Sequence, residues 1–197
     1  MTKYTDFMLD LETLGTSSNA AVVQIGLVGF NPETGETSPP SKLKVRAHPK
    51  SSIDYNTLSW WMNQSEEARK SVFPGEEFVM EPEAALSKLR TAFEAFAVED
   101  FRIWSKPGTF DIPIIESLHR TCGAESYPIP WKHWNTRCLR TLADAAGLAW
   151  TDYEKPTVPH DAGEDALAQA KTALKCFELL KGLDNGDAGE YSKKVDG

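Results

Sequence analysis

Apolar residues form short runs in the first part of the chain. One run lies at residues 7–9 inside a strand-like opening, and a run rich in Val and Ile covers residues 20–30. Residues 31–35 have the composition of a turn, and residues 42–47 then alternate between polar and apolar side chains. Continuous apolar runs are typical of buried strands, and alternation is typical of an edge strand. We therefore predict that the fold begins with three antiparallel strands.

Helical spacing of apolar residues appears next. We predict short helices over residues 59–62 and 65–71, and a long amphipathic helix over residues 82–98. Apolar side chains on one face of the long helix have the spacing of a buried stripe; they are Leu86, Leu89, Phe93 and Phe96. Residues 101–104 predict a fourth strand, which would follow this helix.

The last part of the chain is predicted to be helical. Residues 112–122 and 135–146 predict two helices, which a loop with two prolines separates. The clearest pattern is that of the final helix, where apolar residues recur at helical spacing over residues 166–180. Asp161 and Glu164 resemble a capping pair at its beginning. Strands followed by alternating helix and strand predict an α/β fold.

The chain has 197 residues, which is enough for one domain with a sizeable core and too few for two ordinary domains. We predict a single domain over residues 1–183. Residues 184–197 contain Gly, Asp, Glu and Lys with few apolar residues, and we expect a disordered tail there.

Composition restricts both the compartment and the partners. No apolar run approaches the roughly 20 residues that span a bilayer, and the first residues lack the apolar core of a signal peptide, so we expect an intracellular, cytoplasmic protein. The three cysteines are scattered, which favours reduced thiols. With 21 Lys and Arg against 29 Asp and Glu, the formal net charge is −8. This sign excludes binding of nucleic acid by general phosphate neutralisation, so any contact with a polyanion must be local or metal-mediated.

The sequence Asp10-Leu11-Glu12-Thr13 lies at the end of the first predicted strand. Two carboxylates two residues apart on a strand point to the same face, where they can converge on one cation. The alternative is a strand end in solvent, where acidic residues are common. For an isolated pair of this kind, that alternative is the commoner case.

Two further acidic residues lie near predicted helix starts. Asp111 follows the fourth strand and a short loop, and a helix N-cap would also explain it. His160 precedes the final helix and Asp165 lies in its first turn, where the helix dipole favours an acid. These local explanations do not account for acids at three separate strand or helix ends.

Four carboxylates in one place would repel each other strongly, and a pair of divalent cations would neutralise them. Two such cations about 3.5–4 Å apart are the known arrangement for phosphodiester hydrolysis. Mg²⁺ fits oxygen ligands best, and Mn²⁺ can substitute for it. His160 is then a candidate general base, because imidazole titrates near neutral pH. Metal ions would also let an acidic protein act on a polyanion.

Three motifs together resemble those of the DEDDh (DnaQ-like) 3′–5′ exonucleases. They are Asp10-Leu11-Glu12-Thr13, Gly108-Thr109-Phe110-Asp111, and His160 followed by Asp165. Their order and separation match, and the resemblance extends from residue 4 to about residue 182. Asp10–Gly15 and the Trp60-Trp61 pair are similar to the RNase T-like exonucleases of phages and some bacteria.

The resemblance implies an RNase H-like fold, with a central mixed sheet of about five strands flanked by helices. It implies that Asp10, Glu12 and Asp165 hold the metal ion that activates the nucleophile, and that Asp10 bridges to a second ion supported by Asp111. His160 would be the general base. The substrate would be single-stranded RNA or DNA with a free 3′ end, and many relatives form homodimers. Cys138 stands where the pattern has an acid, so the roles of Arg137 and Arg140 stay open.

Substrate contacts are less defined. By family likeness, Thr13 and Leu14 would contact the 3′-terminal nucleotide. Trp60 and Trp61 are adjacent, so one can stack on a terminal base while the other packs inward, and core packing of both is the alternative. A basic stretch could meet phosphate or be a solvated edge strand; it comprises Lys42, Lys44, Arg46 and Lys50.

The sequence therefore predicts a metal-dependent 3′–5′ exonuclease that releases nucleoside 5′-monophosphates. Two alternatives stay open: a catalytically idle binding module with the same fold, and a hydrolase of very short oligonucleotides. RNA and DNA are not distinguished, because no contact to the 2′-hydroxyl can be placed from spacing.

Overall fold

A computed structural model describes residues 2–73 and 79–184, and it contains a mixed five-stranded sheet in the order β3-β2-β1-β4-β5. The first three strands pair antiparallel, as expected from the sequence, while β4 pairs parallel with β1 and β5 pairs parallel with β4. The strands are β1 (Tyr4–Thr13), β2 (Val22–Phe30), β3 (Ser41–Lys44), β4 (Ala97–Ser105) and β5 (Thr136–Cys138).

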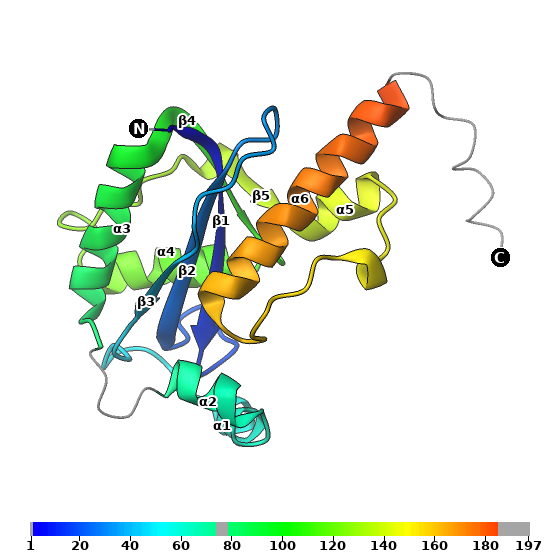
Figure 1. Ribbon diagram of the computed structural model, residues 1–197. Helices are drawn as coiled ribbons and strands as arrows, with labels where there is room; N and C mark the ends of the chain where they lie inside the picture. Colours follow the sequence, from blue (N-terminus) through cyan, green and yellow to red (C-terminus); the bar gives the residue numbers. More distant parts are fainter. Residues whose placement is uncertain (1, 74–78, 185–197) are drawn as a thin grey trace.

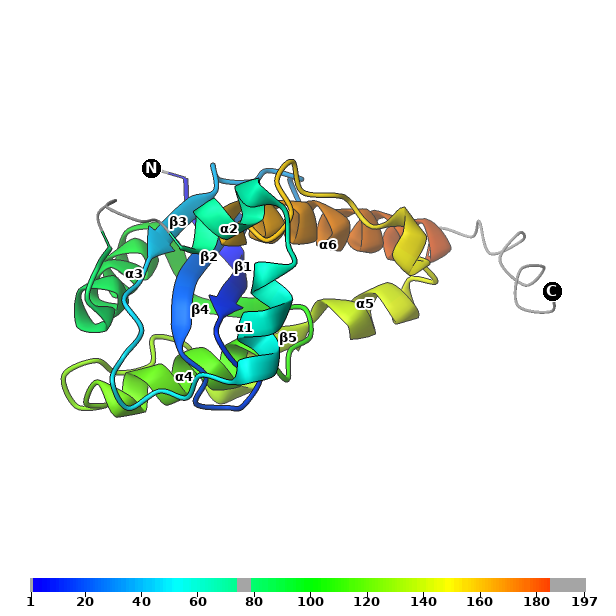
Figure 2. The same cartoon turned by 90° about the horizontal axis from the view of Figure 1, so that it is seen from below.

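Helices cover both faces of the sheet, with α3 and α4 on one face and α5 and α6 on the other (Figure 1). The short helices α1 and α2 lie beyond the carboxyl end of β1, and Figure 2 views the molecule from that end. The helices are α1 (Tyr55–Met62), α2 (Glu66–Val72), α3 (Pro82–Phe96), α4 (Asp111–Thr121), α5 (Leu139–Ala145) and α6 (Ala162–Asp184), with 3₁₀ turns η1 (His133–Asn135) and η2 (Trp150–Asp152). In the described part of the chain, none of the helices has the length and apolar character of a membrane span.

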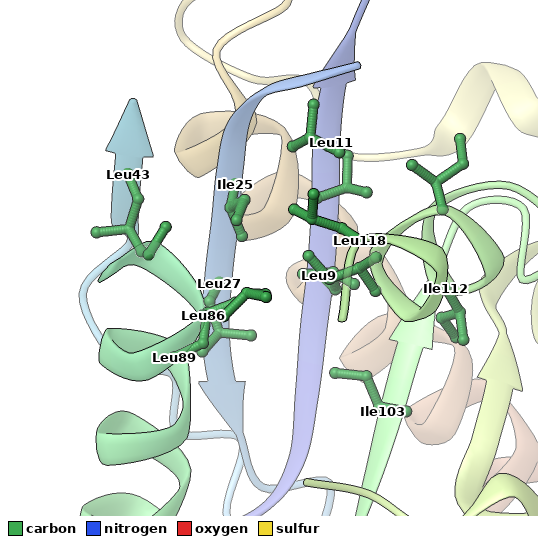
Figure 3. Packing of buried hydrophobic residues seen from close by; sticks show 14 of the residues in the cluster. Leu9, Leu11, Ile25, Leu27, Leu43, Leu86, Leu89, Ile103, Ile112 and Leu118 are labelled. Carbon is green, nitrogen blue, oxygen red and sulfur yellow. The ribbon is translucent and has the colours of Figure 1, made fainter. Parts of the chain in front are cut away.

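The alternation of side chains along β1 divides the core into two layers. Leu9 and Leu11 pack against α3 and α4 in the larger cluster, which Figure 3 shows from close by. Met8 points to the other face and packs with small side chains of α6, namely Ala166, Ala170 and Ala173. Period-two alternation therefore places Asp10 and Glu12, which share the parity of Met8, on the face that α6 covers.

One predicted helix is wrong in part. Residues 135–146 include the strand β5, which pairs with β4 through Ile103 and Thr136, before the helix α5 begins at Leu139. A three-residue strand has too few positions to show alternation, and the helical pattern that follows conceals it. Elsewhere the predicted elements differ by a few residues at their ends, and α6 extends one residue past the predicted domain. The rest of the predicted tail lies outside the described residues.

Gly26 lets α6 approach the sheet closely. It pairs with Asp10 in the β1–β2 ladder, and a Cβ at this position would lie 1.8 Å from the carbonyl oxygen of Ala162. The first turn of α6 therefore lies directly over the centre of β2. Because Asp165 is in that turn, the absence of a side chain at residue 26 positions one of the predicted acids.

Replacing Gly26 by Ala should lower the free energy of unfolding by about 1–3 kcal/mol, because the methyl group overlaps backbone that must move. Gly182→Ala is the matched control: among the described residues, no atom lies within 4 Å of the place its methyl group would take, so the change should be neutral or stabilising by up to about 1 kcal/mol. Urea unfolding of both variants measures the difference. A Gly26→Ala protein as stable as the Gly182→Ala protein would contradict the close packing.

Candidate active site

The structure brings together acids from three distant parts of the chain at the carboxyl end of β1. Glu12 and Asp165 lie beside His160, with possible ligand atoms of all three within 4.8 Å of one another. Asp111 is the first residue of α4, and its Oδ1 accepts the backbone N–H of Leu11 at 3.1 Å. The N-cap of α4 is Phe110, so the N-cap explanation for Asp111 is wrong. Its carboxylate instead links α4 to β1.

Asp10 completes the cluster from the same face of β1 as Glu12. Its Oδ1 accepts a hydrogen bond from the side-chain amide of Gln169 on α6 at 2.6 Å. Sequence reasoning missed Gln169, although it follows Asp165 by four residues and therefore shares its helical face. This contact adds a second point at which α6 is bound to β1.

Burial and mutual repulsion make the acids of the cluster hard to ionise. Burial, and then the charges of Asp111, Glu12 and Asp165, hold the pKa of Asp10 well above its usual range. Burial, with the charges of Asp165 and Asp111, raises the pKa of Glu12 to about 9. Burial raises the pKa of Asp111 to about 7, against the opposing effect of its hydrogen bond from Leu11. Burial also raises the pKa of Asp165.

The donor set fits divalent cations. Among the side chains that the structure describes, the buried atoms without a hydrogen-bond partner include Asp111 Oδ2 and Asp165 Oδ2. An unpartnered buried carboxylate oxygen is costly, and a hard cation offers it the missing partner. A cation would also reverse the mutual repulsion that raises the pKa of Asp10 and Glu12.

His160 has a left-handed backbone, with φ of 61°, which a residue other than glycine seldom adopts. Its ring meets the Trp60 ring edge to face at a centroid distance of 4.9 Å and the Trp61 ring at 5.8 Å. The two tryptophans therefore form one wall for the histidine, while Glu12 and Asp165 lie within ligand distance of it.

The tryptophan pair divides as one of the two sequence interpretations expects. Trp61 is 1% exposed and donates its indole N–H to the carbonyl of Thr13 at 3.0 Å, so it is a core residue. Trp60 is 44% exposed. Leu14 packs in the same small cluster as Trp61, whereas Thr13 lines the neighbouring groove.

This groove has a volume of about 840 Å³ and lies directly beside the acids. Glu12, Trp60 and Phe110 are on its walls, and polar groups of the Gly15–Ser17 loop and α1 complete it. Asp54 supports the loop and the helix together: it accepts the backbone N–H groups of Thr16 at 3.1 Å and Thr57 at 2.7 Å. The size and the mixed lining suit a nucleotide.

The first turn of α6 is held by a buried polar network. As predicted, Asp161 caps the helix, accepting the backbone N–H groups of Gly163 and Glu164. The same carboxylate pairs with Lys42 and accepts the Ser71 hydroxyl at 3.1 Å. Lys42 is exposed on the edge strand β3, and its ammonium group forms this structural ion pair.

The cysteines, and a second group of possible metal ligands, are not part of the group formed by Glu12, His160 and Asp165. The three cysteines are free thiols, of which Cys176 is buried. His48 lies with Glu83 and Cys122, a grouping that no sequence spacing indicates. Burial and the Glu83 carboxylate raise the pKa of the Cys122 thiol to about 11, so this thiol is protonated at neutral pH.

The family model for the 3′–5′ exoribonuclease Rv2179c-like domain matches residues 5–177. The chain belongs to this family. It is 29% identical to an exodeoxyribonuclease of Enterobacteria phage T4, over 94% of each chain. The nuclease domain of 3′hExo, a DEDDh family member bound to rAMP, has the same fold at 12% identity and a TM-score of 0.57, covering 93% of this chain and 94% of that one. Exonuclease I is similar over 91% of this chain and 43% of its own length, at 15% identity and a TM-score of 0.62.

These findings confirm the resemblance seen in the motifs and the RNase H-like fold. The chain is a 3′–5′ exonuclease, and its family is generally dependent on divalent metal ions. The homodimer stays a prediction.

Metal-free protein should lose stability as the pH rises. The pKa of Glu12 is 4.5 in its ordinary state and about 9 in the fold, so between these values the folded state binds the proton that the unfolded state releases. The free energy of unfolding therefore falls as pH increases through this interval. Thermal unfolding in EDTA from pH 5 to pH 9 measures the trend, and Glu12→Gln should reduce its slope. An equal slope in the variant would contradict the assignment.

Proposed function

We propose that the chain is a metal-dependent exonuclease that removes nucleotides one at a time from the 3′ end of single-stranded nucleic acid and releases nucleoside 5′-monophosphates. The observation that carries this proposal is the convergence of four carboxylates and a histidine beside a groove of nucleotide size. The intact set of acids favours an enzyme over an idle binding module.

The carboxylates would hold two Mg²⁺ ions, for which Mn²⁺ can substitute. Asp10, Glu12 and Asp165 would hold one ion, and Asp10 and Asp111 the other. When bound, such ions neutralise the cluster, polarise the phosphodiester and make water more acidic. The unpartnered oxygens of Asp111 and Asp165 support this assignment, because each needs a cationic or hydrogen-bonding partner.

His160 would accept the proton of the attacking water at a ring nitrogen. The Trp60 and Trp61 rings contact the imidazole edge to face and restrict its position. Carboxylate oxygens of Glu12 and Asp165 lie within 4.8 Å of a ring nitrogen. A base held in one position against a fixed acid cluster needs little reorganisation when the proton moves. The left-handed backbone of His160 is consistent with a residue placed for function at some cost in strain.

The groove would bind the 3′-terminal nucleotide. The exposed ring of Trp60 offers a stacking surface for the base, and Thr13 lines the groove beside it. The Asp54 contacts hold the wall in shape before substrate binds. A terminal nucleotide reaches such a groove only when it is unpaired, which is why the proposed substrate is single-stranded.

Matched RNA and DNA oligonucleotides, labelled at the 5′ or the 3′ end, test the proposal in Mg²⁺, Mn²⁺ and EDTA. We expect 5′-labelled substrate to shorten stepwise and 3′-labelled substrate to release a labelled mononucleotide at once. The two sugars measure the preference between RNA and DNA, and oligomers of two to twenty nucleotides separate a strand-degrading enzyme from a hydrolase of very short oligonucleotides. Internal cleavage, or equal activity in EDTA, would reject the proposal.

Asp165→Asn should abolish cleavage, because it removes one charge from the cation site. His160→Ala should lower kcat by about 10²–10⁴-fold, the usual range for loss of a general base. The pH dependence of kcat checks the second role: the variant should lose the limb that reports deprotonation of the imidazole. Thermal unfolding shows that both proteins are folded, and an unchanged pH profile in His160→Ala would remove the histidine from this role.

Trp60→Ala should weaken substrate binding while leaving the fold intact, because its side chain is exposed. Loss of one stacked base costs about 1–3 kcal/mol, so KM should rise roughly five- to hundredfold. Trp60→Phe, which keeps an aromatic face, should restore most of the affinity. Equal KM values for the Ala variant and the unchanged enzyme would exclude stacking on Trp60.

A further inference from the structure

A second hollow, of about 460 Å³, is bordered by Lys106 of the loop between β4 and α4. Phe110 of this loop lines the first groove, whereas Lys106 of the same loop lines the second hollow. Lys106 directly follows β4 and precedes Asp111, the first residue of α4, by five positions in the same loop. The loop that leads to Asp111 therefore borders both hollows.

The second hollow combines cations with aromatic rings. Its walls come from α5 and from the η2 segment, which Figure 2 shows next to α5 and α6. Lys106 lies over the ring of Tyr153 at 5.9 Å, and Lys155 lies over the ring of Trp150 at 5.8 Å. Arg140 lies on the same wall, opposed by two acids, Asp144 and Glu154.

Trp150 has no evident role in the fold. Its side chain is 75% exposed, although tryptophan is normally well buried. The segment that carries it is nevertheless fixed to α6: Lys175 donates to the carbonyl of Asp152 at 3.0 Å, and the Thr172 hydroxyl accepts the backbone N–H of Glu154 at 3.0 Å. An exposed ring on an anchored segment is a preformed stacking surface.

The direction of the strand follows from the two hollows. If the terminal nucleotide occupies the groove at Trp60, the scissile phosphate lies at the acids and the remaining strand continues past them. The second hollow, which is lined by Lys106, Arg140 and Lys155, would then lie on the path of this strand. In a protein with a net charge of −8, these cations meet the phosphates that the cation site does not reach.

We propose that this hollow binds the nucleotides on the 5′ side of the scissile bond, with a base stacked on Trp150 and phosphates against Lys106, Arg140 and Lys155. This inference rests on the proposed function, since it assumes that the terminal nucleotide lies at Trp60. It names the substrate of the site as a strand of several nucleotides rather than a dinucleotide.

The double variant Trp150→Ala/Lys155→Ala tests the proposal, because both side chains are exposed and neither belongs to the acid cluster. Its KM for a 12-nucleotide strand should rise on the order of tenfold, the effect of one lost base stack. The p-nitrophenyl ester of thymidine 5′-monophosphate carries no nucleotide on the 5′ side. The variant should therefore cleave this ester at a rate within about twofold of the unchanged enzyme.

The matched control is Trp134→Ala/Lys132→Ala, a second exposed tryptophan with a lysine over its ring at 5.7 Å. This pair precedes β5, whereas Cys138 at the end of β5 lies against Gly108 of the active-site loop. The control should leave KM unchanged for both substrates. A control variant with the same rise in KM would show a general charge effect and overturn the proposal.

Binding of a fluorescent 12-nucleotide strand, followed by anisotropy, tests the hollow without requiring cleavage. Affinity should fall about tenfold in the Trp150→Ala/Lys155→Ala protein and stay constant in the control. Unchanged binding, or an equal loss of ester cleavage, would overturn the proposed subsite while the nuclease assignment stands. Failure of the unchanged enzyme to cleave any substrate would instead reject the proposed function, and the binding data would still decide the subsite.

Discussion

The mutual repulsion of buried carboxylates at the carboxyl end of β1 is the constraint on which the structure depends. Asp10 and Glu12 are fixed there by the strand, Asp111 by its bond to Leu11, and Asp165 by the first turn of α6. Separating the acids would relieve the repulsion, so the surrounding structure must hold them together. Gly26 and the alanine face of α6 supply this restraint through close backbone packing.

Polar contacts fix the orientation of the first turn of α6 within that packing. Asp161 ends the loop at His160 and caps α6, while its carboxylate also meets Lys42 of β3 and Ser71 of α2. The buried amide of Gln24 joins Ser71 to the backbone of Ala162. His160 and the clustered acid of α6 are thus fixed relative to α2, which follows directly on the helix that carries Trp60. The acid cluster and the groove are parts of one connected structure.

The sequence was sufficient to predict elements with a regular hydrophobic period and a site marked by several motifs. Alternation predicted the antiparallel strands, helical spacing predicted α6, and the conjunction of three motifs predicted which acids converge. It could not show β5, because three residues carry no period. Gln169 shares a helical face with Asp165 and could have been found from its spacing. The position of Lys106 at the second hollow depends on the path of the loop before α4, which the local sequence does not predict.

The net charge of −8 and a polyanionic substrate are compatible because electrostatic effects are short-ranged in salt. At about 0.1 M ionic strength, exposed charges more than about 10 Å away are largely screened, so the strand senses mainly the groups that line its path. Along that path the cation site would neutralise the acids, and a few lysine and arginine side chains alternate with aromatic rings. Phosphate contacts weaken steeply as salt rises, whereas stacking of a base on a ring involves no release of counterions. If the two proposed subsites bind the strand, aromatic surfaces would therefore contribute a larger share of its affinity than in a basic nuclease, which would give the exposed Trp60 and Trp150 a physical reason.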